Sequence, residues 1–243
     1  MNLYRAMRSE LVKLRHTPFI FIHILVPIAG GLLFTSYFAM YQSVSDYNRF
    51  KLVFEIIITF FPLLISIITG LNTLSEDHTS HLQVMLAIPN RKTVFCGKLF
   101  VLLGSGVLSF IGMVVLFSGL VTLNGLISYI PVLMLLKMTA VITFGNIIIY
   151  IFHLFIGLKW GLGASLFLGV FESLQVILYS NITLSGGWKY IPFAWAIELS
   201  HYVSDGELIC HTNEFIIMAI FTIIALVAAV FWISQWEGKK NND

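Results

Sequence analysis

Long apolar runs alternate with short polar segments over almost the whole chain. A helix needs about 20 consecutive apolar residues to cross a bilayer, and six segments reach that length. Only a tight turn separates the fourth of these segments from the fifth. The pattern therefore predicts six membrane-spanning helices, at about 18–41, 52–74, 99–123, 130–156, 160–183 and 214–234.

Residues 1–17 form an amphipathic segment ahead of the first span. Apolar residues recur at helical spacing between basic side chains, which is typical of a helix that lies on the membrane surface with Lys and Arg at anionic headgroups. A disordered basic leader is the alternative interpretation. The apolar stripe consists of Leu3, Ala6, Met7, Leu11 and Leu14.

The longest polar interruption in the N-terminal two-thirds of the chain, residues 75–98, separates the second span from the third. Ser80 and Gln83 have the spacing of a capping box at the start of a helix, and Pro89 cannot continue that helix because it has no backbone N–H. A short amphipathic helix in such a loop lies on lipid headgroups or docks into a partner protein. Its predicted apolar face consists of Leu82, Met85 and Leu86.

Residues 184–213, between the fifth and sixth spans, are too apolar for a solvated loop. Trp and Tyr favour the membrane interface, so we expect an external interfacial segment of short helices that dip back into the outer leaflet. Its aromatic part is a candidate surface for an amphipathic substrate, and an interfacial plug without a substrate role is the alternative. The candidate contact residues are Trp188, Tyr190, Phe193 and Trp195.

The composition agrees with a single membrane-spanning domain over residues 1–243. Charged residues make up 11% of the chain and hydrophobic residues 58%, whereas soluble domains carry about 25% charged residues. No stretch suits a separate soluble domain, and no basic stripe indicates a nucleic-acid partner. We therefore expect an all-α integral membrane protein.

The distribution of Lys and Arg predicts the orientation in the membrane. These residues are enriched in cytosolic segments. If the N-terminus is cytosolic, most of the chain's 14 Lys and Arg residues lie in cytosolic segments. We therefore expect a multi-pass protein of the bacterial plasma membrane with both termini in the cytoplasm.

A nucleotide site requires the pattern Gly-x-x-x-x-Gly-Lys-Ser/Thr, whose backbone N–H groups cradle phosphates. The two Gly-Lys pairs of this chain, at Gly97 and Gly238, are followed by Leu99 and Lys240 instead. Any ATP-driven activity must therefore rely on an ATPase in another chain.

Neither cluster of possible metal ligands has the spacing of a closed zinc site. His78 and His81 stand beside acidic residues, and His201, Cys210 and His211 share the segment before the last span. Ordinary polar loop residues explain both clusters better, so we expect no metal site.

Intramembrane hydrolysis is a further possibility to weigh. Gly163, Ala164 and Ser165 resemble part of an intramembrane serine protease motif, which needs a His on another span as base. His153 on the fourth span could serve. Small residues at helix crossings are the more common explanation for such a motif.

Two charged residues lie within predicted spans, where charges are costly and usually face a partner or a cavity. Lys137 and Glu172 are on the fourth and fifth spans, at depths that differ by about one turn. One hypothesis is that they form an ion pair. The alternative is that Lys137 extends outward to the headgroups and that Glu172 stays protonated.

Together these features resemble a known family. Residues 8–18 form a basic amphipathic helix that leads into the first span, and residues of the loop after the second span match positions that recur in the ABC-2 type permeases. Residues 16–27 further resemble the G-type permease subunits of lantibiotic self-protection transporters. Many members have a Gly in the loop where this chain has Thr79 and Ser80. The matching loop residues are Glu76, Leu82, Leu86, Pro89, Arg91 and Lys98.

The resemblance implies a permease that works with a dimeric cytosolic ATPase and with a second, homologous permease subunit. Residues 1–17 would be the elbow helix, and 75–98 would carry a coupling helix held in a groove of the ATPase. ATP and Mg²⁺ would bind to the ATPase, and no cofactor to this chain. The coupling residues so implied are Glu76, Ser80, Leu82, Met85, Leu86, Pro89, Arg91 and Lys98.

The lantibiotic subgroup expels the producer's own peptide from the membrane and so confers immunity. The resemblance therefore predicts export of an amphipathic antimicrobial peptide, and with it bacteriocin export or antibiotic resistance. Export of another drug, a lipid or a polysaccharide is the alternative within transporters. A membrane-embedded enzyme or a non-transporting sensor would belong to other classes.

Overall fold

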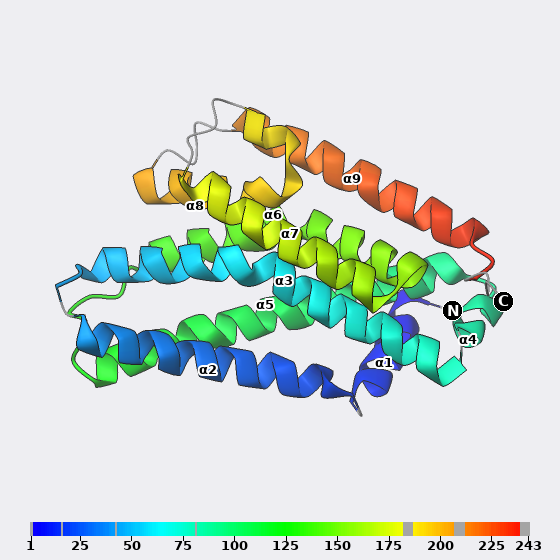
Figure 1. The fold of residues 1–243 in the computed structure, drawn as a ribbon, viewed down its shortest axis with the longest axis horizontal. Helices are drawn as coiled ribbons and strands as arrows, with labels where there is room; N and C mark the ends of the chain where they lie inside the picture. Colours follow the sequence, from blue (N-terminus) through cyan, green and yellow to red (C-terminus); the bar gives the residue numbers. More distant parts are fainter. Residues whose placement is uncertain are drawn as a thin grey trace.

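A computed structural model describes residues 2–15, 17–41, 43–80, 82–181, 187–206 and 212–238. All the regular structure in these ranges is helical (Figure 1). The α-helices are α1 (Leu3–Leu14), α2 (Pro18–Met40), α3 (Asp46–Ser80), α4 (Gln83–Ala87), α5 (Arg91–Leu123), α6 (Val132–Trp160), α7 (Leu162–Asn181), α8 (Trp195–Asp205) and α9 (Thr212–Gln235), with the short 3₁₀ helices η1 (Gly187–Tyr190) and η2 (Pro192–Ala194) before α8.

Six of the described helices are long and apolar enough to cross a membrane, namely α2, α3, α5, α6, α7 and α9. They coincide with the six predicted spans, which confirms the predicted fold class. Two helices extend well beyond the predicted spans, because a polar sequence does not interrupt backbone hydrogen bonding. Helix α3 continues to Ser80, and α5 begins at Arg91, where the Asn90 side chain accepts a hydrogen bond from the Thr93 N–H at 3.2 Å.

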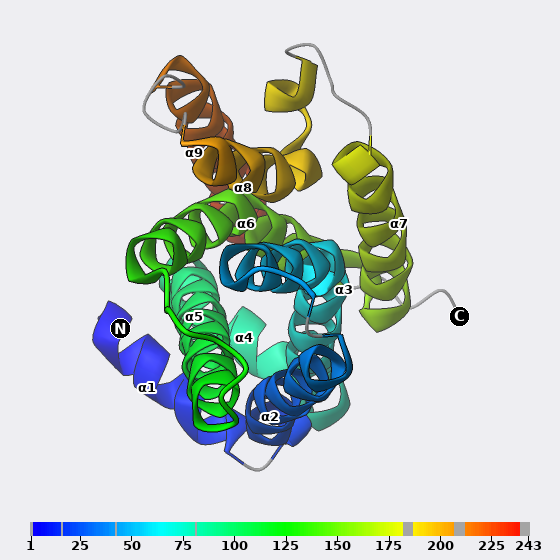
Figure 2. The same ribbon diagram turned by 90° about the vertical axis from the view of Figure 1, so that its left-hand side faces the viewer.

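A view down the bundle shows how the helices are arranged (Figure 2). Helices α2, α3, α5 and α6 surround the centre, α7 packs along α3, and α9 packs along α6. Helices α7 and α9 lie on the periphery and are separated from each other. The turn between α6 and α7 consists of Gly161 alone, whose φ of 88° is a conformation that other residues rarely adopt.

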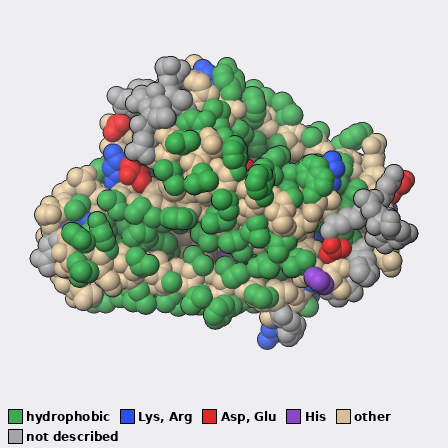
Figure 3. All heavy atoms as spheres, in the orientation of Figure 1, with side chains coloured by type: hydrophobic (Ala, Val, Ile, Leu, Met, Phe, Trp, Pro, Cys, Tyr) green, Lys and Arg blue, Asp and Glu red, His purple; other side chains and the backbone are tan. Residues whose placement is uncertain are grey.

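The lateral surface of the bundle is apolar. Hydrophobic side chains cover most of the visible face, and charged side chains gather mainly toward the two ends (Figure 3). Leu33, Val115, Phe167 and Ile224 are each more than 60% exposed. A soluble protein rarely exposes such a continuous apolar surface, and a bilayer would cover it. The chain is a multi-pass membrane protein.

The two ends of the bundle differ in structure. Helices α1 and α4 lie at one end, where α9 also terminates, and α8 lies at the other end (Figure 1). We refer to these as the α1–α4 end and the α8 end. The predicted helix in 1–17 is present as α1, which packs against α5. The two helices come close at Gly97, where an added Cβ would lie 2.8 Å from the Cβ of Ala6.

Candidate functional site

The polar loop after the second span folds differently from its predicted form. Ser80 is the last residue of α3, and α4 begins only at Gln83. Leu82 occupies the position before α4, with a φ of 64° and no capping hydrogen bond from its side chain. The predicted capping box is therefore wrong.

Burial of the Leu82 side chain explains this turn. A left-handed conformation costs a non-glycine residue about 1–3 kcal/mol. Fully burying a leucine contributes about 1.5–3 kcal/mol, and Leu82 is 1% exposed. Burial of the Leu82 side chain is therefore large enough to offset the local cost of this turn.

The apolar face of α4 is directed toward its own chain. Leu82 and Met85 are each 1% exposed and belong to the main hydrophobic core. The prediction that these two side chains enter a groove of a partner is therefore wrong for this structure. The side chains of Ser80 and Leu86 lie outside the described residues.

The surface of this region is formed by other residues. Gln83, Ala87, Pro89 and Asn90 are exposed. A depression of about 390 Å³ lies where the segment after α4 meets α5 and the end of α9, and its lining is more polar than apolar. It is lined by Ala87, Ile88, Pro89, Asn90, Arg91, Lys92 and Ser234.

Close to α4, a network of charges joins three helices. Lys98 of α5 donates hydrogen bonds to Glu10 Oε2 of α1 at 2.6 Å, to Glu76 Oε1 of α3 at 2.8 Å and to Asn72 Oδ1 at 3.3 Å. Lys13 of α1 bridges the same two carboxylates, at 3.0 Å from Glu10 Oε1 and 2.7 Å from Glu76 Oε1. We call Glu10, Lys13, Asn72, Glu76 and Lys98 the Lys98 cluster.

Most of the Lys98 cluster is removed from solvent. The exposed fractions of Lys98, Glu10 and Glu76 are 1%, 2% and 6%, and Lys13 covers the outer side. Burial lowers the pKa of Lys13, but the two carboxylates raise it by more, so the net pKa is raised. Two acids and two bases balance in charge, and hydrogen bonds satisfy each ammonium group, as buried ions require.

Sequence reasoning selected only part of this cluster. The predicted residues Glu76 and Lys98 do come together, whereas Arg91 donates to the backbone oxygen of Trp236 after α9. Glu10, Lys13 and Asn72 were missed. Ala6, Glu10 and Leu14 are the buried residues of α1 and are spaced by four, so the apolar stripe itself indicated that Glu10 lies on the buried face.

Glu172 pairs with His153, and the predicted ion pair with Lys137 is wrong. Glu172 Oε2 lies 2.9 Å from His153 Nε2, and His153 Nδ1 lies 2.9 Å from the hydroxyl of Ser165. Ser165 donates in turn to the backbone oxygen of Ser66 on α3 at 3.1 Å. We call Ser66, Ser165, His153 and Glu172 the His153 chain.

The proton positions in the His153 chain argue against a serine nucleophile. Ser165 has one proton, and donation to Ser66 requires His153 Nδ1 to donate to the Ser165 oxygen. A proton between His153 Nε2 and Glu172 then leaves the chain neutral. The opposite assignment, with the Ser165 hydroxyl donating to His153 Nδ1 and an ionised Glu172 accepting from Nε2, would bury a net negative charge in hydrocarbon, which is costly. His153 thus holds a proton toward Ser165, whose side chain is 0% exposed.

The aromatic segment before α8 is only partly accessible. Its helical form, with η1, η2 and α8, agrees with the predicted short helices. Trp188 and Trp195 are 2% and 0% exposed and belong to the core, so they are not available as contact residues in this structure. Tyr190 is 56% exposed, and Phe193 lines a crevice.

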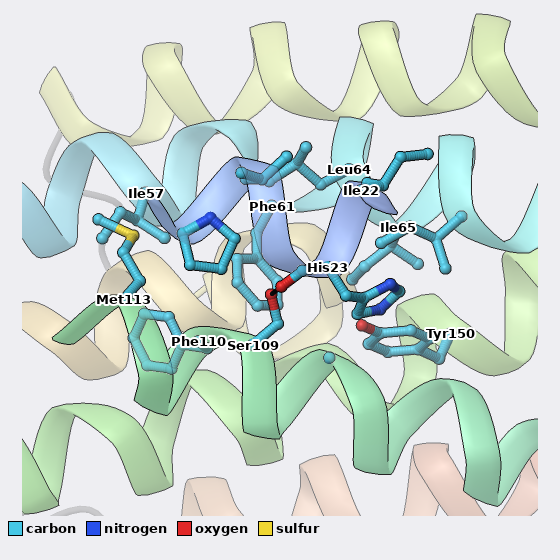
Figure 4. Close-up of a pocket in the computed structure, with 14 residues that line it drawn as sticks. Ile22, His23, Ile57, Phe61, Leu64, Ile65, Ser109, Phe110, Met113 and Tyr150 are labelled. Atoms are coloured by element: carbon cyan, nitrogen blue, oxygen red, sulfur yellow. Dashed lines mark hydrogen bonds between the residues drawn. The ribbon is translucent and has the colours of Figure 1, made fainter. Parts of the chain in front are cut away.

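A small cavity lies among α2, α3, α5 and α6 (Figure 4). Its volume of about 50 Å³ suits water but not a transported peptide. His23, Ser109 and Tyr150 place polar groups at its wall. His23 Nδ1 contacts the Phe19 oxygen at 2.8 Å, whereas its Nε2 is buried and has no partner among the described residues.

Within the described ranges, no three His, Cys, Asp or Glu side chains converge as metal ligands would. His81, Cys210 and His211, which the sequence offered as possible ligands, lie outside the described residues.

Comparison with known proteins adds the family. The sequence matches the ABC-2 family transporter proteins over residues 6–183, which includes most of α1 and the first five long helices. Neither the curated proteins nor the solved structures include a match. Members of this family are membrane subunits and are not themselves the ATPase; they generally work with a separate cytosolic ATPase. By this match over most of its length, the chain belongs to the ABC-2 family of transporter proteins.

Proposed function

We propose that this chain is the permease subunit of an exporter that removes an amphipathic antimicrobial peptide from the membrane and gives the producing cell immunity. A dimeric cytosolic ATPase would supply the energy, and a second homologous permease would complete the transporter. The α1–α4 end, with both termini, would face the cytoplasm. Family membership over residues 6–183 is the observation that carries the transport role.

The α1–α4 end has the features that a coupling site needs. Helix α4 is short, presents polar and small residues to the outside, and is continuous in sequence with α3 and α5. Leu82 and Met85 anchor α4 in the core. A force applied to α4 would therefore be transmitted to α3 and α5. The Lys98 cluster would carry the same movement to α1.

The proposed ATPase contact is the exposed surface from Ala87 to Asn90 and the depression beside it. This replaces the buried face of α4 as the docking surface, while Leu86 stays a candidate contact. Arg91 and Lys92 line the depression, so an acidic or carbonyl-rich surface of the ATPase would complement it.

The cargo assignment depends on the resemblance of residues 16–27 to the lantibiotic subgroup. A molecule drawn from the outer leaflet would approach the bundle from the side. Export of another drug, a lipid or a polysaccharide stays the alternative cargo.

Coupling can be tested by co-expressing the chain with the cytosolic ABC ATPases of the same genome, one at a time, and comparing two variants. Ala87→Arg adds a bulky charge to the exposed surface of α4, and Asn124→Arg adds the same charge at the exposed α8 end. We expect Ala87→Arg to abolish ATPase co-purification or ATPase stimulation, while Asn124→Arg retains both. Equal retention in both variants would contradict the proposed contact.

The cargo can be tested separately by deleting the chain from the producing strain and measuring tolerance to its own peptide. We expect tolerance to fall at least tenfold and to return with the wild-type chain. If tolerance is unchanged although the co-expression experiment shows ATPase binding, the peptide is excluded as the cargo and the transport role stays in place.

A further inference from the structure

A crevice lies beside the His153 chain, between two helices that do not pack against each other. Its floor is α6, one wall is α9, Glu172 of α7 stands on the other side, and η2 closes it toward the α8 end. Its volume is about 550 Å³. We call it the Glu172 crevice; it is lined by Ile148, Ile149, Ile151, Phe152, Phe155, Glu172, Pro192, Phe193, Ala225, Ala228, Ala229 and Trp232.

The lining is apolar with a single exception. Three alanines of α9 recur at helical spacing and leave room against α6, and aromatic rings from α6, η2 and α9 cover the remaining wall. Glu172 is the only titratable residue of this lining. An apolar crevice of this volume with one carboxyl group is complementary to an apolar molecule that carries one cationic group.

The His153 chain determines how the net charge of the crevice changes when a cationic group binds. His153 and Glu172 together hold the proton that lies between them, and the pair is neutral. If an ammonium group binds Glu172 and that proton leaves to solvent, the carboxylate keeps a positive partner and His153 stays neutral. Charge in the low-dielectric region is then unchanged, which avoids the cost of burying a net ion.

We propose that the Glu172 crevice is a binding site for an amphipathic ammonium that enters from the lipid phase and displaces one proton. Among the described residues, the titratable partner of Glu172 is His153 on α6. Ser66 of α3, which ends the His153 chain, is neutral, and the described crevice residues of α9 and η2 carry no charge. The identification of the bound molecule as cargo rests on the proposed function, whereas the binding itself does not.

The test uses the full chain in lipid nanodiscs without any ATPase. Its result therefore does not depend on whether the proposed ATPase contact or the proposed peptide cargo is correct. The probes are a pyrene-labelled alkylammonium and the matched pyrene-labelled alcohol. Binding is followed by energy transfer from tryptophan, since Trp232 lines the crevice. We expect the ammonium to bind more tightly as the pH rises, because binding releases a proton, and the alcohol to bind with the same affinity at every pH.

Two substitutions, each with a matched control, test the carboxyl group of Glu172 and the volume of the crevice independently. Glu172→Gln should weaken ammonium binding at least tenfold and remove its pH dependence while the alcohol still binds. Glu55→Gln, the same change on α3 outside the crevice, should alter neither. Ala225→Phe fills the crevice and should prevent binding of both probes, whereas Ala140→Phe on the exposed side of α6 should not.

Several results would overturn the proposal. Ammonium binding by the wild-type chain that does not depend on pH would show that no proton is displaced. Equal binding in Ala225→Phe and Ala140→Phe would show that the probe binds elsewhere. If Glu172→Gln does not fold, the wild-type pH dependence and the alanine pair still decide between the outcomes.

Discussion

Lys98 shows how this bundle keeps a charged side chain inside. Its ammonium group contacts two carboxylates and one amide oxygen, supplied by α1 and α3. Each of these acceptors is itself nearly or fully buried. Removing one member of a buried ion network costs more than the network contributes, because the remaining charges lose their partner and cannot regain water.

Replacing Lys98 with Met should therefore strongly destabilise the protein. Glu10 and Glu76 would stay buried with only Lys13 between them, and we expect a loss of about 3–5 kcal/mol of folding free energy. Thermal unfolding in detergent measures it. Lys13→Met, at a position whose side chain is 39% exposed, should cost clearly less. Equal losses in the two variants would show that the burial of Lys98 does not matter.

Glu198 provides a pH-dependent prediction at the α8 end. Burial raises the pKa of its carboxyl group to about 7 from an ordinary value of 4.5. The folded state therefore binds this proton more tightly than the unfolded state does. The stability that this group contributes is fully present below pH 4.5 and is lost as the pH rises toward 7.

Glu198→Gln should accordingly flatten the pH dependence of stability. We expect the difference in melting temperature between pH 5 and pH 8 to become smaller than in the wild type. A wild-type pH profile that the Glu198 substitution leaves unchanged would contradict the raised pKa.

At the scale of elements, α3 and α7 approach closely because small residues face each other. A Cβ added at Gly169 of α7 would lie 2.2 Å from the hydroxyl oxygen and 2.5 Å from the Cβ of Ser66. In lipid, helices associate by close packing and by polar contacts, since lipid tails are as apolar as the side chains. The same contact region contains the hydrogen bond from Ser165 to Ser66.

Gly169→Ala should thus separate two helices that must touch. We expect a loss of about 1–3 kcal/mol in stability, as for other overpacked interiors. Gly163→Ala on the same helix is the matched control, because an added Cβ there meets no atom within 4 Å; it should be neutral or stabilise by up to about 1 kcal/mol. Unfolding in detergent compares the two, and similar stabilities would argue against the close α3–α7 contact.

At the scale of the whole molecule, the two ends of the bundle differ in structure. The α1–α4 end carries the Lys98 cluster, and the α8 end carries η1, η2 and α8. The Glu172 crevice lies between them, on the side where α7 and α9 diverge (Figure 2). Movement of α3 would reach the His153 chain directly, because Ser66 of α3 accepts the hydrogen bond from Ser165.

The proposed orientation predicts opposite labelling of the two ends. In a chain whose natural cysteines are replaced by Ser, a single Cys at Ala87 should react with an impermeant thiol reagent only after the cells are opened. A single Cys at Asn124 should react in intact cells. Reversed accessibility would invert the proposed topology without affecting the fold.

The sequence by itself determined the membrane class and the number of spans. Continuous apolar stretches of sufficient length form membrane-spanning helices, because the backbone groups of such a stretch must hydrogen-bond within a helix when they lie in lipid. The amphipathic spacing of residues 1–17 likewise predicted α1. These features depend on local pattern and length alone.

Only the tertiary structure decided which polar residues meet. Glu172 could pair with Lys137 by depth along the helices, but helix rotation directs it to His153 instead. Leu82 and Met85 have the spacing of an exposed docking face, yet the turn at Leu82 folds them into the core. Spacing along a helix determines which residues share a face. Only the packing of neighbouring helices determines what that face contacts.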